Sequence, residues 1–113
     1  MTTLDVTMSE RPGGAQLTLS GELDIATAPK LEDEVQRAEK DGHALIVIDL
    51  RGLEFMDSSG LRALLAADSR ARARGARIVL VRGDERIQRV LRITRMDERL
   101  EMVDDAETLA GAA

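Results

Sequence analysis

The sequence predicts an α/β fold, in which a mixed sheet of about four to five strands is covered by about four packed helices. Two nearly unbroken runs of branched apolar residues, at residues 45–48 and 78–81, are typical of strands buried on both faces. Segments with apolar residues three and four positions apart lie between and after these runs, and this spacing is typical of helices. Strand and helix thus alternate, as in sheets that carry helices as covering elements. A chain of 113 residues has room for one such domain, which we place at residues 1–113.

The first predicted element is a β-hairpin. Apolar and polar residues alternate over residues 4–9 and again around Leu17 and Leu19, which is the period of a half-buried strand. Between these segments, Pro12 presets φ and the two following glycines accept positive φ. Residues 11–14 therefore have the composition of a turn.

The first predicted helix follows the hairpin. Thr27 is a suitable N-cap, and Asp41 and Gly42 end the helical pattern. Its apolar residues form one stripe opposite charged residues, and they are Ala28, Leu31, Val35 and Ala38. The apolar run at residues 45–48 then predicts the central strand of the sheet.

The second predicted helix begins at Asp57, Ser58 and Ser59, which supply N-cap side chains, and it runs to Gly75. After the strand at residues 78–81, a third helical stripe consists of Ile87, Val90, Leu91 and Thr94. Residues 101–103 predict a short edge strand. Asp104 or Asp105 is expected to cap a last helix, which runs through Glu107 and Leu109.

Composition excludes several classes of function. The net charge is −5 with both signs spread along the chain, and Phe55 is the only aromatic residue, so we expect no binding to nucleic acid. The absence of cysteine removes disulfides, thiolate chemistry and most structural zinc sites, and we expect no cofactor and no metal. Residues 1–9 lack the basic segment and apolar core of a secretory signal, and the apolar stretches fall short of the ~20 residues of a membrane helix. We therefore expect a soluble cytoplasmic protein that does not bind membranes.

The most informative segment is residues 47–65. A buried strand is expected to continue through a loop at residues 51–56 into the helix that starts at Asp57-Ser58-Ser59-Gly60-Leu61. Ligand sites of open α/β sheets lie beyond the carboxyl ends of strands, where N–H groups at helix starts are unpaired. A phosphate on Ser58 would face those N–H groups and the helix dipole, a gain of roughly 0.3–1 kcal/mol. It would also add ~1.5–2 negative charges to a surface that a partner must cover. The segment predicts a serine switch, with plain helix capping and phosphorylation of Ser59 as the alternatives.

These residues resemble the STAS-domain anti-sigma factor antagonists, in which an Asp-Ser-Ser/Thr-Gly-Leu helix start is the modification site. Gly21-Glu22-Leu23-Asp24-Ile25 looks like a second motif of that family, and the resemblance extends over nearly the whole chain. It implies a STAS fold and the function of an anti-sigma factor antagonist. The unphosphorylated form would bind an ATP-using anti-sigma factor serine kinase and release its sigma factor. Phosphorylation at Ser58 would end this binding, and a PP2C-type phosphatase would restore it.

Carried over residue by residue, the resemblance divides the partner-binding surface between two motifs. The residues are Gly21, Glu22 and Asp24 in the first motif, and Asp57, Ser58, Ser59, Gly60 and Leu61 in the second. Two departures from the family lie in the C-terminal third. Arg95-Met96-Asp97 stands where a Gly-Leu-Asp turn is common, and Leu100 stands where an aromatic residue is common. They leave the Ser58 motif intact but bear on the last helix and on any partner contact there.

Two other classes of function are alternatives. An enzyme would use Ser58 as its nucleophile and His43, the only histidine, as its base. However, His43 precedes the central strand and Ser58 follows it, which places them near opposite ends of the sheet, so we expect no enzymatic activity. The second alternative is a STAS interaction subunit of a lipid-transport or stressosome-like assembly, which would keep the fold without phosphorylation.

Several charged residues also have plainer structural interpretations. Asp24 suits a turn, Asp57 suits an N-cap, and Asp49 suits the polar end of the central strand. Two sets of arginines are expected on solvated faces, although the second set forms a stripe suited to an acidic partner. They are Arg70, Arg72 and Arg74 near the end of the second helix, and Arg86, Arg89, Arg92, Arg95 and Arg99 on the third helix and beyond.

Overall fold

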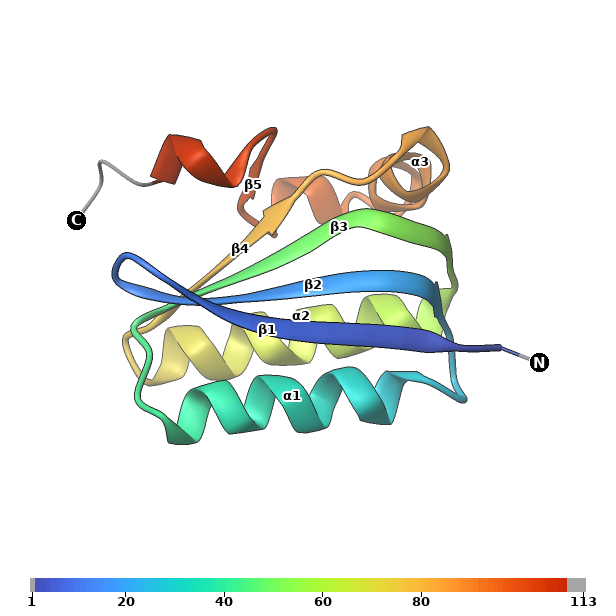
Figure 1. The fold of residues 1–113 in the computed structure, drawn as a ribbon. Coiled ribbons are helices and arrows are strands. Elements are labelled where there is room, and N and C mark those ends of the chain that lie inside the picture. The colour runs from blue at the N-terminus through green and yellow to red at the C-terminus, as the bar shows by residue number, and fades with distance from the viewer. Residues whose placement is uncertain (1, 110–113) are drawn as a thin grey trace.

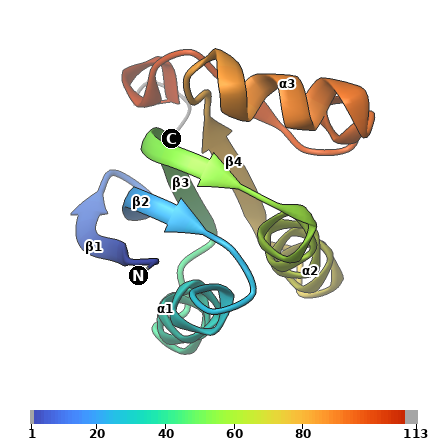
Figure 2. The same cartoon turned by 90° about the vertical axis from the view of Figure 1, so that its right-hand side faces the viewer.

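In the computed structural model, which describes residues 2–109, two helices cover one face of a five-stranded sheet (Figure 1). These helices are α1 (Ala28–Lys40) and α2 (Ser58–Ala73). A third helix, α3 (Glu85–Ile93), lies across the sheet from α1, as both views show (Figures 1 and 2). Two short 3₁₀ helices follow it, η1 (Met96–Glu98) and η2 (Ala106–Leu109).

The sheet is mixed, as predicted. Its strands are β1 (Leu4–Arg11), β2 (Gly14–Leu23), β3 (Leu45–Met56), β4 (Arg77–Val81) and β5 (Met102–Val103), and they lie side by side in chain order. β1 and β2 pair antiparallel as the predicted hairpin, with a two-residue turn at Pro12 and Gly13. The other strand pairs are parallel, so the carboxyl ends of β2, β3 and β4 point in one direction.

β3 is longer than the sequence predicts, because residues 51–56 continue the strand and do not form a loop. β2 remains paired with β3 as far as Leu23 and Met56, with irregularities in the register after Thr18 and after Gly21. The backbones approach closely at Gly52, where an added Cβ would lie 2.5 Å from the carbonyl oxygen of Leu19. These irregularities break the period-two pattern, which is why the segment does not look like a strand in the sequence.

The predicted helix boundaries are mostly confirmed. α1 ends at Lys40 with Asp41 as its C-cap, followed by Gly42 with φ of +79°, and α2 has Asp57 as its N-cap. Thr27 occupies the N-cap position of α1 but makes no side-chain capping bond.

The predicted last helix is wrong, because residues 106–109 form a 3₁₀ turn, so the described chain has three α-helices and not about four. Only Ala106 and Leu109 are buried there, and a spacing of three residues suits a 3₁₀ turn. Of the two predicted caps, Asp105 accepts from the N–H of Glu107 at 2.9 Å. The domain that we expect at residues 1–113 extends at both ends beyond the described residues.

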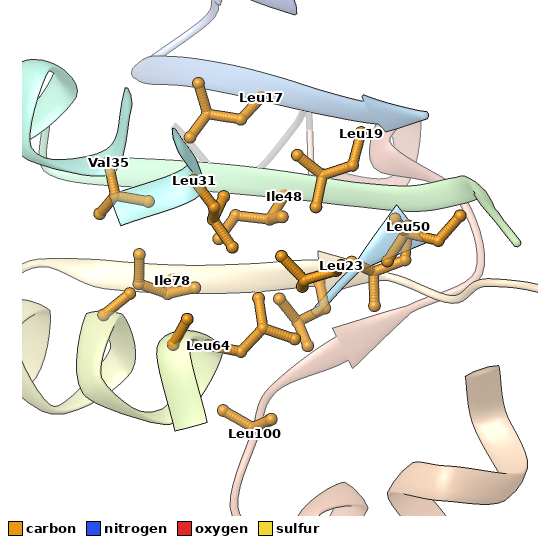
Figure 3. Close-up of a cluster of buried hydrophobic side chains, with 14 of the residues drawn as sticks. Leu17, Leu19, Leu23, Leu31, Val35, Ile48, Leu50, Leu64, Ile78 and Leu100 are labelled. Atoms are coloured by element: carbon orange, nitrogen blue, oxygen red, sulfur yellow. The ribbon is translucent and has the colours of Figure 1, made fainter. Parts of the chain in front are cut away.

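Two hydrophobic clusters explain the apolar runs of β3 and β4. The main cluster lies between the sheet and the helices, with Leu17, Ile48 and Leu64 fully buried at its centre (Figure 3). A smaller cluster on the opposite face joins Val47, Val79 and Val81 to η2. Since burying one such side chain is worth about 1.5–3 kcal/mol, both faces of the central strands contribute to stability.

Arg95 is the one residue other than glycine with positive φ among residues 2–109. It follows the C-cap of α3 with φ of 60° and ψ of 21°, a left-handed conformation that favours glycine at this position. A residue with a side chain costs roughly 1–2 kcal/mol more there. Leu100, the second position at which the sequence departs from the family pattern, is buried in the main cluster.

Candidate functional site

The two predicted site motifs come together at the carboxyl ends of β2 and β3. Leu23 pairs with Met56 as the last pair of the parallel ladder, and the N–H of Asp57 donates to the carbonyl of Leu23 at 3.2 Å. From this edge the chain leaves β2 through a short loop into α1, and it leaves β3 through Asp57 into α2. The first turns of both helices therefore lie beside each other.

The side chain of Asp57 already occupies the start of α2. Its Oδ1 atom accepts from the N–H groups of Ser59 and Gly60, at 2.9 and 3.1 Å, and its carbonyl accepts from the N–H of Leu61 at 3.0 Å. This corrects one step of the sequence argument, in which those N–H groups were free to receive a phosphate. A phosphate on Ser58 would feel the helix dipole, but it would be added beside a carboxylate.

The two candidate hydroxyls differ in exposure. Ser58 is the first residue of α2 and is exposed, whereas Ser59 is half-buried and lines a groove between α1 and α2. Within residues 2–109, neither hydroxyl has a hydrogen-bond partner that would hold it in one orientation. Ser58 is therefore the more accessible acceptor for a modifying enzyme.

Gly60 permits close packing of α2 on the end of β2. A Cβ at this position would lie 2.6 Å from Cγ of Leu23 and 2.7 Å from its carbonyl oxygen. Leu61 turns into the main cluster and is buried. These two site residues therefore fix the position of the helix start and offer little surface themselves.

Asp24 forms the turn between β2 and α1. It is only 8% exposed, and its Oδ1 atom accepts from the N–H groups of Ala26 and Thr27, at 2.9 and 3.1 Å. The hydroxyl of Thr27 accepts from the N–H of Asp24 at 2.9 Å and donates to the carbonyl of Glu22 at 2.7 Å. This closed turn presents Ile25 to solvent, 76% exposed.

Gly21 and Glu22 also have structural roles. Gly21 has φ of +112°, and a Cβ there would lie 2.4 Å from the carbonyl oxygen of Thr3. The N–H of Glu22 donates to that same carbonyl at 2.8 Å. The first motif thus ties the end of β2 to β1 and to the turn before α1.

Sequence analysis missed the exposed apolar surface of this edge. A groove of about 380 Å³ separates the first turns of α1 and α2, and Phe55 near the end of β3 is 47% exposed. The groove is lined by Ile25, Ala28, Pro29, Glu32, Ser59, Arg62, Ala63 and Ala66. The sequence does contain an indication of this surface. Ile25 and Phe55 are large apolar residues close to turn and capping residues, where side chains tend to be exposed.

Asp49 does not end the central strand, because β3 continues to Met56. Its carboxylate is 3% exposed and accepts from Nε and Nη2 of Arg51, at 3.0 and 2.8 Å, and from the N–H of Arg51 at 3.0 Å. Burial by itself raises the pKa of Asp49, but the hydrogen bonds and the charge of Arg51 outweigh it and hold this pKa below its ordinary value. The pair stabilises the sheet and lies outside the site.

The arginines near the end of α2 connect elements and do not simply face solvent. Arg70 pairs with Glu39 of α1 at 3.2 Å, and Nη2 of Arg74 donates to the carbonyl of His43 at 3.1 Å. Arg72 pairs with the buried Asp68 at 2.8 Å and donates to the carbonyl of Arg99. Arg72 and Arg74 are nevertheless exposed, as predicted for a solvated face, whereas Arg70 is half-buried.

Members of the second arginine set also form ion pairs within the protein. Arg86 pairs with Asp84, the N-cap of α3, and Arg92 pairs with Glu85, whereas α3 ends before Arg95 and Arg99.

His43 and Ser58 lie at opposite ends of β3, whose 12 residues separate them, so the geometry of a nucleophile and its base is not assembled. No helix among residues 2–109 is long and apolar enough to cross a membrane, and no three acidic or histidine side chains there form a metal site.

The fold and the paired motifs define the class of protein. The STAS domain family model matches residues 5–109, and the chain belongs to this family. Its relatives include anti-sigma factor antagonists. The chain is 36% identical over 67 residues to the anti-sigma-F factor antagonist RsfB of Mycobacterium tuberculosis, a match that covers 59% of this chain and 55% of that protein. It is 30% identical over 84 residues to the anti-sigma-B factor antagonist of Listeria monocytogenes, covering 74% of each.

Solved structures have the same fold. An anti-sigma factor antagonist from Mycobacterium paratuberculosis superposes with a TM-score of 0.82 and 25% identity, over 97% of this chain and 93% of that one. The unphosphorylated form of the anti-sigma factor antagonist SpoIIAA has a TM-score of 0.75 and 21% identity, over 95% and 93% of the two chains. SpoIIAA of Bacillus in the phosphorylated form has a TM-score of 0.71 and 20% identity, over 98% and 100%.

Proposed function

We propose that this protein is a cytoplasmic anti-sigma factor antagonist that is switched at Ser58 and has no catalytic activity of its own. The unphosphorylated form binds an anti-sigma factor serine kinase and so releases the sigma factor that the kinase holds. Phosphorylation of Ser58 ends the binding, and a PP2C-type phosphatase restores it. The observation that carries this proposal is an exposed serine at the first turn of α2, directly beside an apolar groove and the exposed Ile25. The relatives named anti-sigma factor antagonists support the same class of function.

The expected size of the switch follows from the charge that the phosphate adds. A phosphoserine carries ~1.5–2 negative charges. At about 6 Å from a partner's carboxylate and an effective dielectric constant of about 20, each pair of like charges costs about 3 kcal/mol. This corresponds to roughly two decades of affinity, enough to dissociate most of the complex at ordinary protein concentrations.

The test compares four forms of the protein for binding to an anti-sigma factor kinase by calorimetry. Unmodified protein and Ser58→Ala are expected to bind. Ser58→Asp adds one charge and is expected to bind up to about 100-fold more weakly, and protein with phosphoserine installed at residue 58 adds more charge and is expected to bind at least about 100-fold more weakly. Ser59→Ala is the matched control for the site of modification, and it should accept phosphate like the parent.

Equal affinity of the modified and unmodified forms would contradict the proposed switch. Such a result, together with co-purification of a transporter ATPase or a large scaffold, would instead favour the lipid-transport or stressosome-like assembly. Phosphate transfer to Ser58→Ala would move the acceptor to Ser59.

A further inference from the structure

β1 forms one margin of the sheet, and no other strand among residues 2–109 lies on its outer side. The strand order starts at β1, which pairs only with β2 among the described strands. Figure 2 looks along the strands and shows β1 with no element beyond it on that side. An eight-residue edge with unpaired backbone groups is a template for another strand.

The hairpin register decides which groups of β1 point outward. Arg11 and Gly14 flank the two-residue turn as a hydrogen-bonded pair, and pair types alternate along an antiparallel ladder. The N–H of Glu22 donates to the carbonyl of Thr3, which agrees with this alternation. Odd-numbered residues of β1 therefore bond to β2.

The even-numbered residues of β1 consequently direct their N–H and C=O groups to the free side. Leu4 belongs to this set, and its carbonyl accepts from Nζ of Lys30 at 2.7 Å, as an outward group should. Val6, Met8 and Glu10 complete the set. In residues 2–109, no backbone hydrogen bond outside the strand ladders engages them.

One register allows a second copy of the chain to pair with these groups. A two-fold axis at Met8 places this residue opposite Met8 of the partner subunit, and Val6 opposite Glu10 of the partner subunit. Outward groups then meet outward groups, in roughly six backbone hydrogen bonds at two per pair. Leu4, whose carbonyl Lys30 occupies, lies outside this ladder.

The same register brings opposite charges together. Asp5 stands opposite Arg11 of the partner subunit, in a pair of the type whose side chains approach most closely. The pair occurs twice by symmetry. An axis at Thr7 would instead place Asp5 opposite Ser9 of the partner subunit, without charge complementarity.

Arg11 has donor capacity left for such a partner. Its Nη1 and Nη2 atoms donate to Oε1 of Gln16 at 3.3 Å and to the carbonyl of Ala106 at 2.9 Å. A guanidinium has five N–H groups, of which these bonds use two, and the Arg11 side chain is only partly buried. A carboxylate on the neighbouring strand would add the missing opposite charge.

We propose that this protein forms a two-fold dimer through β1, in which two sheets join into one and Asp5 pairs with Arg11 of the partner subunit. This inference is independent of the proposed switch. Ser58 follows β3, which is separated from the free edge by β2 and β1, so the dimer leaves both copies of the serine exposed.

The first test is sedimentation equilibrium from about 10 µM to about 1 mM protein, where mass action should reveal a dimer. Met8→Pro removes an outward N–H and no bond to β2, and we expect it to weaken the dimer at least about tenfold. Met8→Ala keeps that N–H and is the matched control, which should still dimerise. Asp5→Arg should weaken the dimer, and adding Arg11→Asp to it should restore association.

The second test needs no variant. Amide hydrogen exchange of the parent protein, followed by NMR at low and high concentration, should show protection of Val6, Met8 and Glu10 that grows with concentration. Asp5, Thr7 and Ser9 already bond to β2 and should not change. A monomer over the whole concentration range would overturn the proposal. So would a dimer in which the three outward amides exchange as fast as in dilute solution.

Discussion

Gly60→Ala is the most direct test of how the helix start that carries Ser58 is built. The added Cβ would lie 2.6 Å from Cγ of Leu23, 2.7 Å from its carbonyl oxygen and 3.0 Å from its Cδ2. Ordinary carbon contacts are about 3.5–4.0 Å, so the first turn of α2 must move by about 1 Å or Leu23 must leave its rotamer. Overpacking of this kind costs about 1–3 kcal/mol, and the better helix propensity of alanine returns up to about 1 kcal/mol.

The expected net destabilisation by Gly60→Ala is therefore about 1–2 kcal/mol, or about 4–8 °C in the midpoint of thermal unfolding. Urea unfolding followed by circular dichroism measures it. If the proposed function is correct, displacing the turn that carries Ser58 should also weaken binding to the proposed anti-sigma factor kinase under conditions in which the variant is fully folded.

Gly42→Ala is the matched control for Gly60→Ala. Nothing lies within 4 Å of a Cβ at Gly42, but its φ of +79° makes the substitution cost roughly 1–2 kcal/mol through the backbone alone. Gly42 follows α1 at the opposite end from the switch site, so this variant should lose stability and keep its partner. If Gly60→Ala unfolds at the same urea concentration as the parent, the close contact between β2 and α2 does not exist. If both variants lose binding equally, global stability and not the position of α2 is responsible.

Four further outcomes test other parts of the molecule. Asp57→Ala removes a cap that holds two N–H groups and should lower the free energy of unfolding by about 1 kcal/mol in urea titration, with Asp57→Asn recovering most of it. Ile25→Ala should leave stability within about 0.5 kcal/mol, because the side chain is exposed, but should weaken binding to the proposed kinase in calorimetry; a loss of stability instead would place Ile25 in the core. Arg51 holds the pKa of Asp49 below its ordinary value, so their pair stabilises the fold at pH above the ordinary carboxyl pKa. This stabilisation is lost as pH falls through the lowered pKa. Arg51→Ala should therefore reduce the fall in stability with acid in a curve of unfolding free energy against pH. Arg95→Gly should raise stability by about 1 kcal/mol, since glycine accepts φ of 60°, and an unchanged urea midpoint would refute the strain.

The order of the elements could be predicted because each periodic segment carries a clear pattern. The runs at residues 45–48 and 78–81 are buried on both faces, and the stripe of α1 faces the main cluster, as their patterns require. That residues 21–24 and 57–61 meet also follows from the sequence, since parallel strands end at one edge of the sheet.

The remaining features depend on contacts that a linear pattern does not carry. Residues 51–56 lack the period of a strand because the register with β2 is irregular. At Gly52 the backbone of β2 lies so close that a side chain would not fit. Asp24 could be identified as a turn former, but the exposure of Ile25 follows from how the turn closes on Thr27. Likewise, only the coordinates show that Arg70 reaches Glu39 on another helix.

The carboxylate of Asp57 has a consequence for the timing of regulation. Because it already accepts from the N–H groups of Ser59 and Gly60, a phosphate on the neighbouring Ser58 finds these two groups occupied. Under the proposed switch, the backbone of the helix start is then the same before and after modification, and dephosphorylation requires no refolding. On the same proposal, the recovery time would depend on how often a phosphatase meets the exposed phosphoester of Ser58, without a contribution from stored conformational energy.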